Sequence, residues 1–193
     1  MYSINNHKNI KLANVKQNRF LSIAKLGIPV FHVDDLARIW GINNRNTLLT
    51  SLKRYVESGL IYRIYRGLYS IRPTIELDPV LLGARAINSY CYLSGETILA
   101  KEGIIFQQLN SFMFVGKKTK RFKIGDYEYY CRQLKDKFLY NDIGVDKTGK
   151  FNLATPERAV ADILYFNPKY HFDNPGAINW AEVKRISALV YNK

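Results

Sequence analysis

The sequence predicts an α+β protein of two domains, and three observations support that class. Segments with the 3.6-residue period of amphipathic helices stand beside segments in which apolar and polar residues alternate as in strands. A proline-bounded stretch, 73–79, interrupts these patterns and ends in Asp78-Pro79, a typical helix start. With 193 residues and 47% hydrophobic residues, the chain is long enough for one large domain or two small ones and apolar enough to bury a core.

These observations set the expected domain boundaries. We expect a first domain over 1–72, of which 1–17 is a polar, Asn-rich loose arm, then a linker over 73–79 and a second domain over 80–193. The second domain is predicted to be a mixed α/β domain with a small antiparallel sheet.

The first domain begins with a helix and a short strand. The apolar spacing predicts a helix over 18–26 with Gly27 as its end, and a strand over 30–33 after Pro29. A second helix follows, which Asp34 can cap and Gly41 can end.

A third helix is predicted over 45–58, after a sharp turn. One side of its helical period carries the apolar residues Leu48, Leu49, Leu52, Tyr55 and Val56. Beyond it, runs rich in Ile, Leu and Tyr flank Arg66-Gly67 and predict a β-hairpin over 60–71. Strand, helix, helix and hairpin, in that order, predict a winged helix-turn-helix.

The outer side of the third helix is the candidate recognition surface. Its side chains can contact base edges and phosphates, and no acidic residue occurs before Glu57. The candidate DNA-binding residues are Arg45, Asn46, Thr47, Thr50, Lys53 and Arg54 on this helix, with Arg63 and Arg66 on the wing. The alternative is a helical hairpin and ribbon whose polar face only meets water.

The positive charge is concentrated in the first domain. The formal net charge is +13, and residues 1–72 carry 12 Lys and Arg against 3 Asp and Glu, while the rest carries 17 against 13. No helix combines this basic character with a strongly apolar face, so the excess favours nucleic acid over a membrane surface. Binding through phosphates would depend strongly on salt.

The second domain is predicted to contain helices over 80–87, 95–102, 157–165 and 180–190, with Ser94 and Thr155 as caps of the second and third. Alternating runs at 111–115, 121–124 and 127–134 predict antiparallel strands. From the gap between the first two runs into the second run, five basic residues are expected at a hairpin tip, namely Lys117, Lys118, Lys120, Arg121 and Lys123. They form either a solvated turn or a second nucleic-acid or partner contact.

Catalytic and metal-binding patterns are not apparent. The three histidines share no spacing, no Gly-rich phosphate loop occurs, and Cys91 and Cys131 lack metal-ligand spacing and are expected as buried free thiols. We therefore expect no catalytic residue, no metal and no cofactor. The rival hypothesis is a metal-dependent nuclease that uses Asp126 and Glu128, which share a strand face.

Targeting segments are likewise not apparent. No run reaches the ~20 apolar residues of a membrane span, and the first residues do not resemble a signal peptide. The sequence thus predicts a cytoplasmic protein with no membrane partner.

Three motifs resemble one protein family. They are ESGLIYRIYRGLY at 57–69, YLSGET at 92–97 and ATPERAVAD at 154–162. In this order and at these distances they resemble AbiEi-type antitoxins, regulators from bicistronic toxin-antitoxin systems, over residues 18 to about 166. The resemblance implies a winged helix that represses its own operon at inverted repeats, and a second domain that counters a nucleotidyltransferase-like toxin.

The sequence thus predicts a sequence-specific DNA-binding repressor of the antitoxin type. Its partners would be double-stranded operator DNA and a cognate toxin. A stand-alone winged-helix regulator without a toxin, and an interaction module whose basic face binds an acidic protein, remain alternatives. The operator sequence and the oligomeric state stay open.

Overall fold

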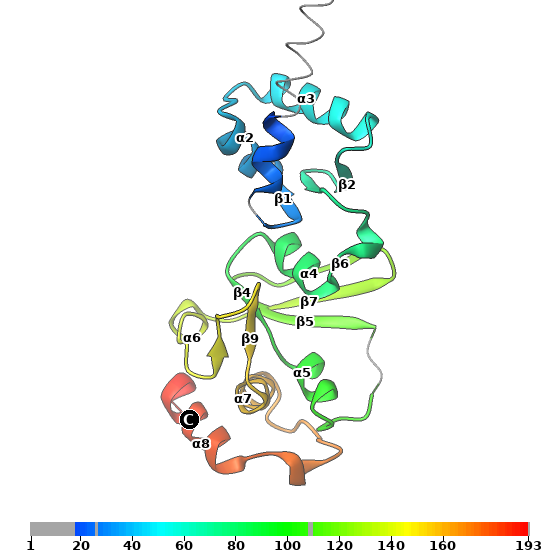
Figure 1. Cartoon of the computed structure of the whole chain (residues 1–193). Coiled ribbons are helices and arrows are strands. Elements are labelled where there is room, and N and C mark those ends of the chain that lie inside the picture. Colours follow the sequence, from blue (N-terminus) through cyan, green and yellow to red (C-terminus); the bar gives the residue numbers. More distant parts are fainter. Residues whose placement is uncertain (1–17, 26, 108–109, 193) are drawn as a thin grey trace, which may run out of the picture. The chain divides into compact units, whose positions relative to one another are not determined.

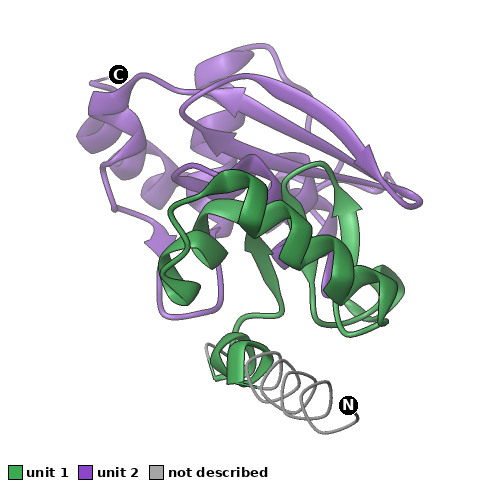
Figure 2. Ribbon diagram, turned by 90° about the horizontal axis from the view of Figure 1, so that it is seen from above, with its two compact units in different colours: residues 1–77 green, residues 78–193 purple. Residues whose placement is uncertain are grey.

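The computed structural model of the chain describes residues 18–25, 27–107 and 110–192. The chain divides into two compact units, unit 1 over 1–77 and unit 2 over 78–193 (Figure 2). The boundary between Leu77 and Asp78 falls inside the segment 73–79. The expected arm, 1–17, lies outside the described residues. Among the described helices, none has the length and apolar character that a membrane crossing requires.

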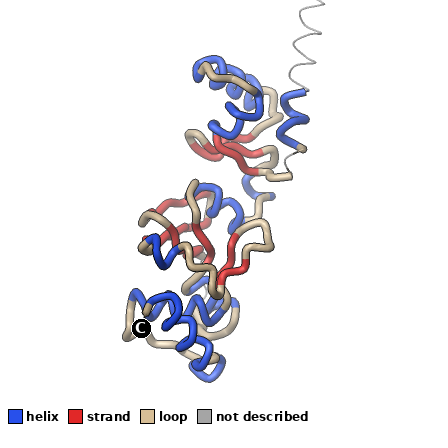
Figure 3. Tube along the Cα trace, turned by 90° about the vertical axis from the view of Figure 1, so that its left-hand side faces the viewer, coloured by secondary structure: helices blue, strands red, loops and turns tan. Residues whose placement is uncertain are grey.

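Unit 1 is mixed helix and strand, with one small antiparallel sheet. Residues 18–24 are helical, and the elements that follow are β1 Val30–His32, α2 Val33–Trp40, α3 Arg45–Glu57, β2 Tyr62–Tyr65, β3 Leu68–Ser70 and the short 3₁₀ helix η1 Thr74–Glu76. The strand order is β1-β3-β2, and both pairs are antiparallel. Figure 3 shows the strands of this unit in red beside its helices in blue.

The start of α2 differs from the sequence prediction. Asp34 is not the cap, because α2 begins one residue before it, after His32. Asp35 supports this helix start, because its carboxylate accepts a hydrogen bond from the backbone N–H of His32, the N-cap residue, at 3.0 Å. Gly41 ends α2 in the left-handed conformation, with φ of +62°.

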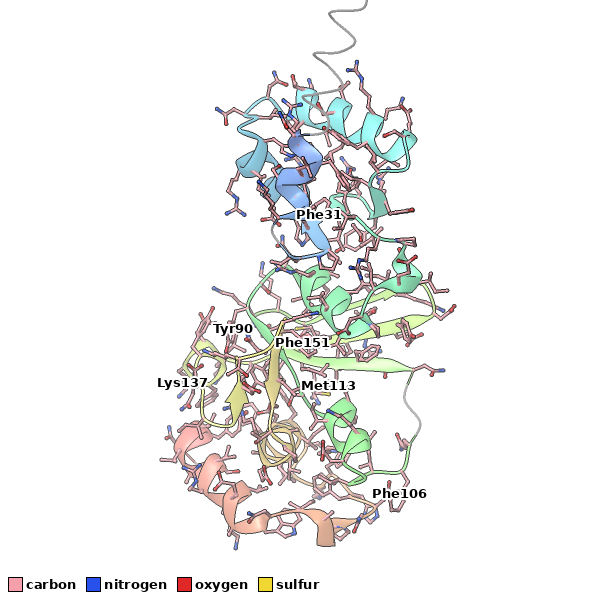
Figure 4. All side chains as sticks on the ribbon, in the orientation of Figure 1. Phe31, Tyr90, Phe106, Met113, Lys137 and Phe151 are labelled. Carbon is pink, nitrogen blue, oxygen red and sulfur yellow. The ribbon has the colours of Figure 1, made fainter. Side chains whose placement is uncertain are left out.

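The helix α3 has a conventional start. The Asn44 side chain accepts a hydrogen bond from the Thr47 backbone N–H at 3.0 Å, and the first turn contains no acidic residue. Leu48, Leu52 and Tyr55 are buried in the core of unit 1, together with Phe31 (Figure 4). Leu49 was expected on this buried face, but 42% of its surface is exposed.

Unit 2 is a six-stranded sheet with helices on both faces. Its elements are α4 Pro79–Ile87, β4 Cys91–Leu93, α5 Glu96–Lys101, β5 Ser111–Gly116, β6 Lys120–Ile124, β7 Tyr127–Gln133, α6 Asp136–Leu139, β8 Val145–Asp146, β9 Asn152–Ala154, α7 Pro156–Phe166, the 3₁₀ helix η2 Pro175–Ala177 and α8 Trp180–Tyr191. In Figure 1, α4 lies on one face of the sheet and α5 and α7 lie on the other, where α8 packs against α7.

The sheet of unit 2 is mixed, so the expected small antiparallel sheet is wrong for this unit. The strand order is β6-β7-β5-β4-β9-β8, and the pairs β5–β7 and β4–β9 are parallel. The expected hairpin between β5 and β6 is also wrong, because β7 lies between them. Residues 117–119 instead carry the chain across the end of β7. Alternation of apolar and polar residues shows which face a side chain occupies but not which strand is its neighbour.

Both cysteines lie in the core of unit 2 as free thiols, as expected. Burial raises the pKa of Cys91 to about 12 and that of Cys131 to about 11. At neutral pH both thiols are therefore protonated and unreactive.

Two of the quoted motifs meet in a buried ionic cluster. Arg158 and Asp162, one turn apart on α7, are fully buried and joined at 2.8 Å from Nε to Oδ1. The Arg158 guanidinium also donates to the Tyr92 hydroxyl and to the backbone carbonyls of Phe138, Asn141 and Ile143. Burial opposes its charge, but Asp162 together with the hydroxyl groups of Tyr92 and Tyr191 outweighs this and raises the pKa of Arg158 above its usual value. The guanidinium thus ties α7 to β4, α6 and the following loop.

Asp162 completes the cluster. It accepts hydrogen bonds from the Ser94 hydroxyl at 2.7 Å and from the Tyr191 hydroxyl at the end of α8. Ser94 was expected to cap α5, but its hydroxyl binds Asp162 instead. That helix follows Gly95, which has a φ of +58° and where a Cβ would lie 2.2 Å from the sulfur of Met113. Only glycine fits there.

Candidate nucleic-acid interface

A basic groove in unit 1 lies between α3 and the β2–β3 hairpin. It has a volume of about 540 Å³ and combines residues from both elements. Four of the candidate DNA-binding residues line it, namely Arg45 and Lys53 of α3 and Arg63 and Arg66 of the hairpin. The fold therefore joins cationic side chains that the sequence only placed on separate elements.

The hairpin geometry holds its two arginines at this groove. Arg63 pairs with Tyr69 across β2 and β3, and the register shifts between Arg63 and Tyr65, next to the turn. Gly67 has a φ of +92°, a conformation that glycine adopts without strain. The bulged, twisted end of the hairpin is the part that carries Arg66.

The charges of the groove are only weakly neutralised. Lys53 Nζ lies 3.7 Å from Glu57 Oε1, and Arg45 Nη1 lies 3.3 Å from Asp34 Oδ1. All four side chains are well exposed, so water screens both pairs and neither fixes its cation firmly. The cationic groups are therefore free to exchange these partners for phosphates.

The remaining candidates on α3 are exposed but do not line the groove. These are Asn46, Thr47, Thr50 and Arg54. Helical spacing puts Asn46, Thr50 and Lys53 on neighbouring parts of the solvent face. The surface of α3 thus has one flank of cations beside the hairpin and a polar outer ridge.

One groove residue was missed by the sequence analysis. Leu49 was expected on the apolar side of the helical period together with Leu48 and Leu52, but it lines the groove instead. Leu49 lies four residues after Arg45 and four before Lys53, so the three side chains share one face of the helix. This spacing is the signal that would have placed Leu49 at the groove. An apolar side chain there can contact a thymine methyl group.

The lysine-rich run of unit 2 is divided by the structure. Lys117, Lys118 and Lys120 line one pocket. Arg121 and Lys123 share the face of β6 opposite to that of Lys120, and the Arg121 guanidinium lies 4.4 Å from the centre of the Tyr130 ring. The five residues are therefore not a single contact surface.

The rival nuclease residues are both exposed. Asp126 lies in the turn between β6 and β7, and Glu128 on β7 is opposite Lys123 of β6. Within the described residues, no group of three or more His, Cys, Asp or Glu side chains is arranged to hold a metal ion.

Neither a protein-family model nor a curated protein matches the chain.

Proposed function

We propose that the chain is a sequence-specific DNA-binding repressor and that unit 1 is a winged helix-turn-helix. The observation that carries this proposal is the groove in which Arg45 and Lys53 of α3 face Arg63 and Arg66 of the hairpin. A polar face that only meets water does not require cations from two elements to line one groove. Such an arrangement is what contact with a DNA backbone requires.

The division of labour follows from the two parts of the α3 surface. A helix of ~10–12 Å diameter fits the major groove of B-DNA, which is ~12 Å wide. With α3 in that groove, Asn46 and Thr50 on the outer ridge would read base edges, while Lys53 and Arg54 would contact phosphates. The hairpin arginines would contact the backbone beside them.

The antitoxin role is a second step of the proposal. Its support is the motif resemblance alone, since the cluster of Tyr92, Ser94, Arg158 and Asp162 gives two of the three motifs a structural role. In this proposal unit 1 binds inverted repeats in the operator and unit 2 counters a nucleotidyltransferase-like toxin.

Single substitutions on α3 test the assignment. Asn46→Ala or Thr50→Ala should relax sequence preference, with a loss of about 1–3 kcal/mol of discrimination at one base pair. Lys53→Ala or Arg54→Ala should weaken specific and random duplexes alike, because phosphates carry no sequence information. The measurement is fluorescence anisotropy with a duplex selected from a random pool and with a scrambled duplex.

Equal losses on both duplexes for all four variants would contradict the recognition-helix assignment. The same duplex incubated with Mg²⁺ separates the rival class, because a nuclease that uses Asp126 and Glu128 would shorten it.

A further inference from the structure

Unit 2 contains a second basic concavity, at the start of β6. Lys117, Lys118 and Lys120 line it together with Asn88, Ser89 and Thr119, and its volume is about 640 Å³. Among the described residues that line it, none is acidic. We propose that this lysine pocket binds a phosphate of the DNA backbone, as a contact of unit 2 separate from the groove of unit 1.

The crossing between β5 and β6 builds the pocket. Residues 117–119 pass over the end of β7, and the Thr119 hydroxyl oxygen accepts a hydrogen bond from the Gln133 backbone N–H at 3.2 Å. This bond ties the crossing to the sheet. A mobile surface loop would lose more conformational entropy on binding than this tethered segment does.

Lys120 has a supporting role in the pocket. Its Nζ donates to the backbone carbonyl of Ala86 at 2.8 Å, in the last turn of α4. A helix end of this kind carries partial negative charge, which would repel an anion. The Lys120 ammonium offsets that charge and leaves Lys117 and Lys118 for a ligand.

The two remaining lysines are available. Lys117 Nζ lies 4.0 Å from Asp136 Oδ2, and at least half of each side chain is exposed, so this pair is weak. Lys118 forms no ion pair within the part of the chain that the structure describes. The hydroxyl groups of Ser89 and Thr119 and the Asn88 amide add hydrogen-bond donors. Ammonium groups beside hydroxyl and amide donors are typical of phosphate contacts.

A polyanion fits this pocket better than a small free anion. The pocket is open to solvent, and ordering two exposed lysines costs side-chain entropy that one small anion offsets poorly. Duplex DNA adds the release of counterions at each phosphate that is contacted. The choice of duplex DNA rests on the proposed function, which brings DNA to this chain.

The test is a ¹H–¹⁵N NMR titration of the full chain with a short duplex. We expect the amide resonances of Ser89 and Thr119 to shift together with those of α3. In Lys117→Ala/Lys118→Ala the α3 shifts should remain and the Ser89 shift should be lost. Affinity should fall about tenfold at ~0.1 M salt, with a salt slope lower by about one, as for one lost phosphate. The control Lys101→Ala/Lys169→Ala removes the same charge from exposed sites elsewhere in unit 2 and should match the wild type.

Each result separates this inference from the proposed function. If α3 shifts while Ser89 and Thr119 do not, or if both double variants lose affinity equally, the lysine pocket is not a phosphate site and the function of unit 1 stands. If only Ser89 and Thr119 shift, the pocket stands and the role of α3 is wrong. If nothing shifts, both are wrong. A further titration uses inorganic phosphate at the concentration of phosphate groups that the duplex supplies. If it shifts the Ser89 and Thr119 resonances as much as the duplex does, the pocket takes the free anion and the DNA assignment is overturned.

Discussion

Arg158→Ala should destabilise unit 2 by about 3–5 kcal/mol, a large share of the stability of a domain of this size. The substitution removes the partner of Asp162, which is fully buried, and leaves a carboxylate without its neutralising charge. It also removes the donors to the Tyr92 hydroxyl and to three backbone carbonyls. Buried acceptors that lose their donors add their own penalty.

The two tryptophans allow each unit to be followed separately. Trp40 belongs to unit 1 and Trp180 to unit 2. In a Trp40→Phe background, urea unfolding followed by Trp180 fluorescence should show a much lower midpoint for Arg158→Ala. In a Trp180→Phe background, the Trp40 transition should not change.

Arg185→Ala is the matched control. Arg185 also binds a carboxylate on its own helix, with two bonds to Glu182 at 2.6 and 2.7 Å, but the pair is exposed. Water screens it, so its loss should leave the midpoint almost unchanged. Equal effects of Arg158→Ala and Arg185→Ala would contradict a structural role for the buried cluster.

DNA binding and any antitoxin activity should separate at the boundary between Leu77 and Asp78. Unit 1 has its own buried core, built from α2, α3 and the small sheet, and unit 2 has another around its six-stranded sheet. A fragment of 1–77 should therefore fold alone, though marginally because of its size. It should end at 77 rather than 72, since the compact unit extends to Leu77.

The expected result is that fragment 1–77 shifts duplex DNA in a gel, more weakly if unit 2 adds contacts. Fragment 78–193 should rescue growth when a neighbouring toxin gene is expressed, without repressing the operon. If 1–77 is folded by circular dichroism yet binds no duplex, or if it alone neutralises the toxin, this division of labour is wrong.

Features fixed by a few neighbouring residues could be predicted from the sequence. The hairpin turn at Arg66-Gly67, the end of α2 at Gly41 and the Thr155 cap of α7 occur as expected, because glycine conformation and capping oxygens act within one turn of chain. The eight candidate residues of unit 1 are all exposed. Their exposure could be predicted too, because the helical and strand periods determine which side of an element faces solvent.

Features that depend on partners distant in sequence could not be predicted. The pairing of β5 with β7, the use of Ser94 by Asp162 and the exposure of Leu49 all depend on what packs nearby in space. The groove is of this kind too. The sequence identified its cations, but only the fold brings Arg45 and Lys53 opposite Arg63 and Arg66.

The most direct test of the central proposal is the salt dependence of duplex binding by the full chain. A duplex selected from a random pool should bind with an affinity that falls linearly with salt on logarithmic axes, and Arg66→Ala should lower that slope by about one. The control Lys169→Ala, an exposed lysine outside the groove, should leave the slope unchanged. Failure to select any duplex, or a slope that Arg66→Ala does not alter, would contradict the account.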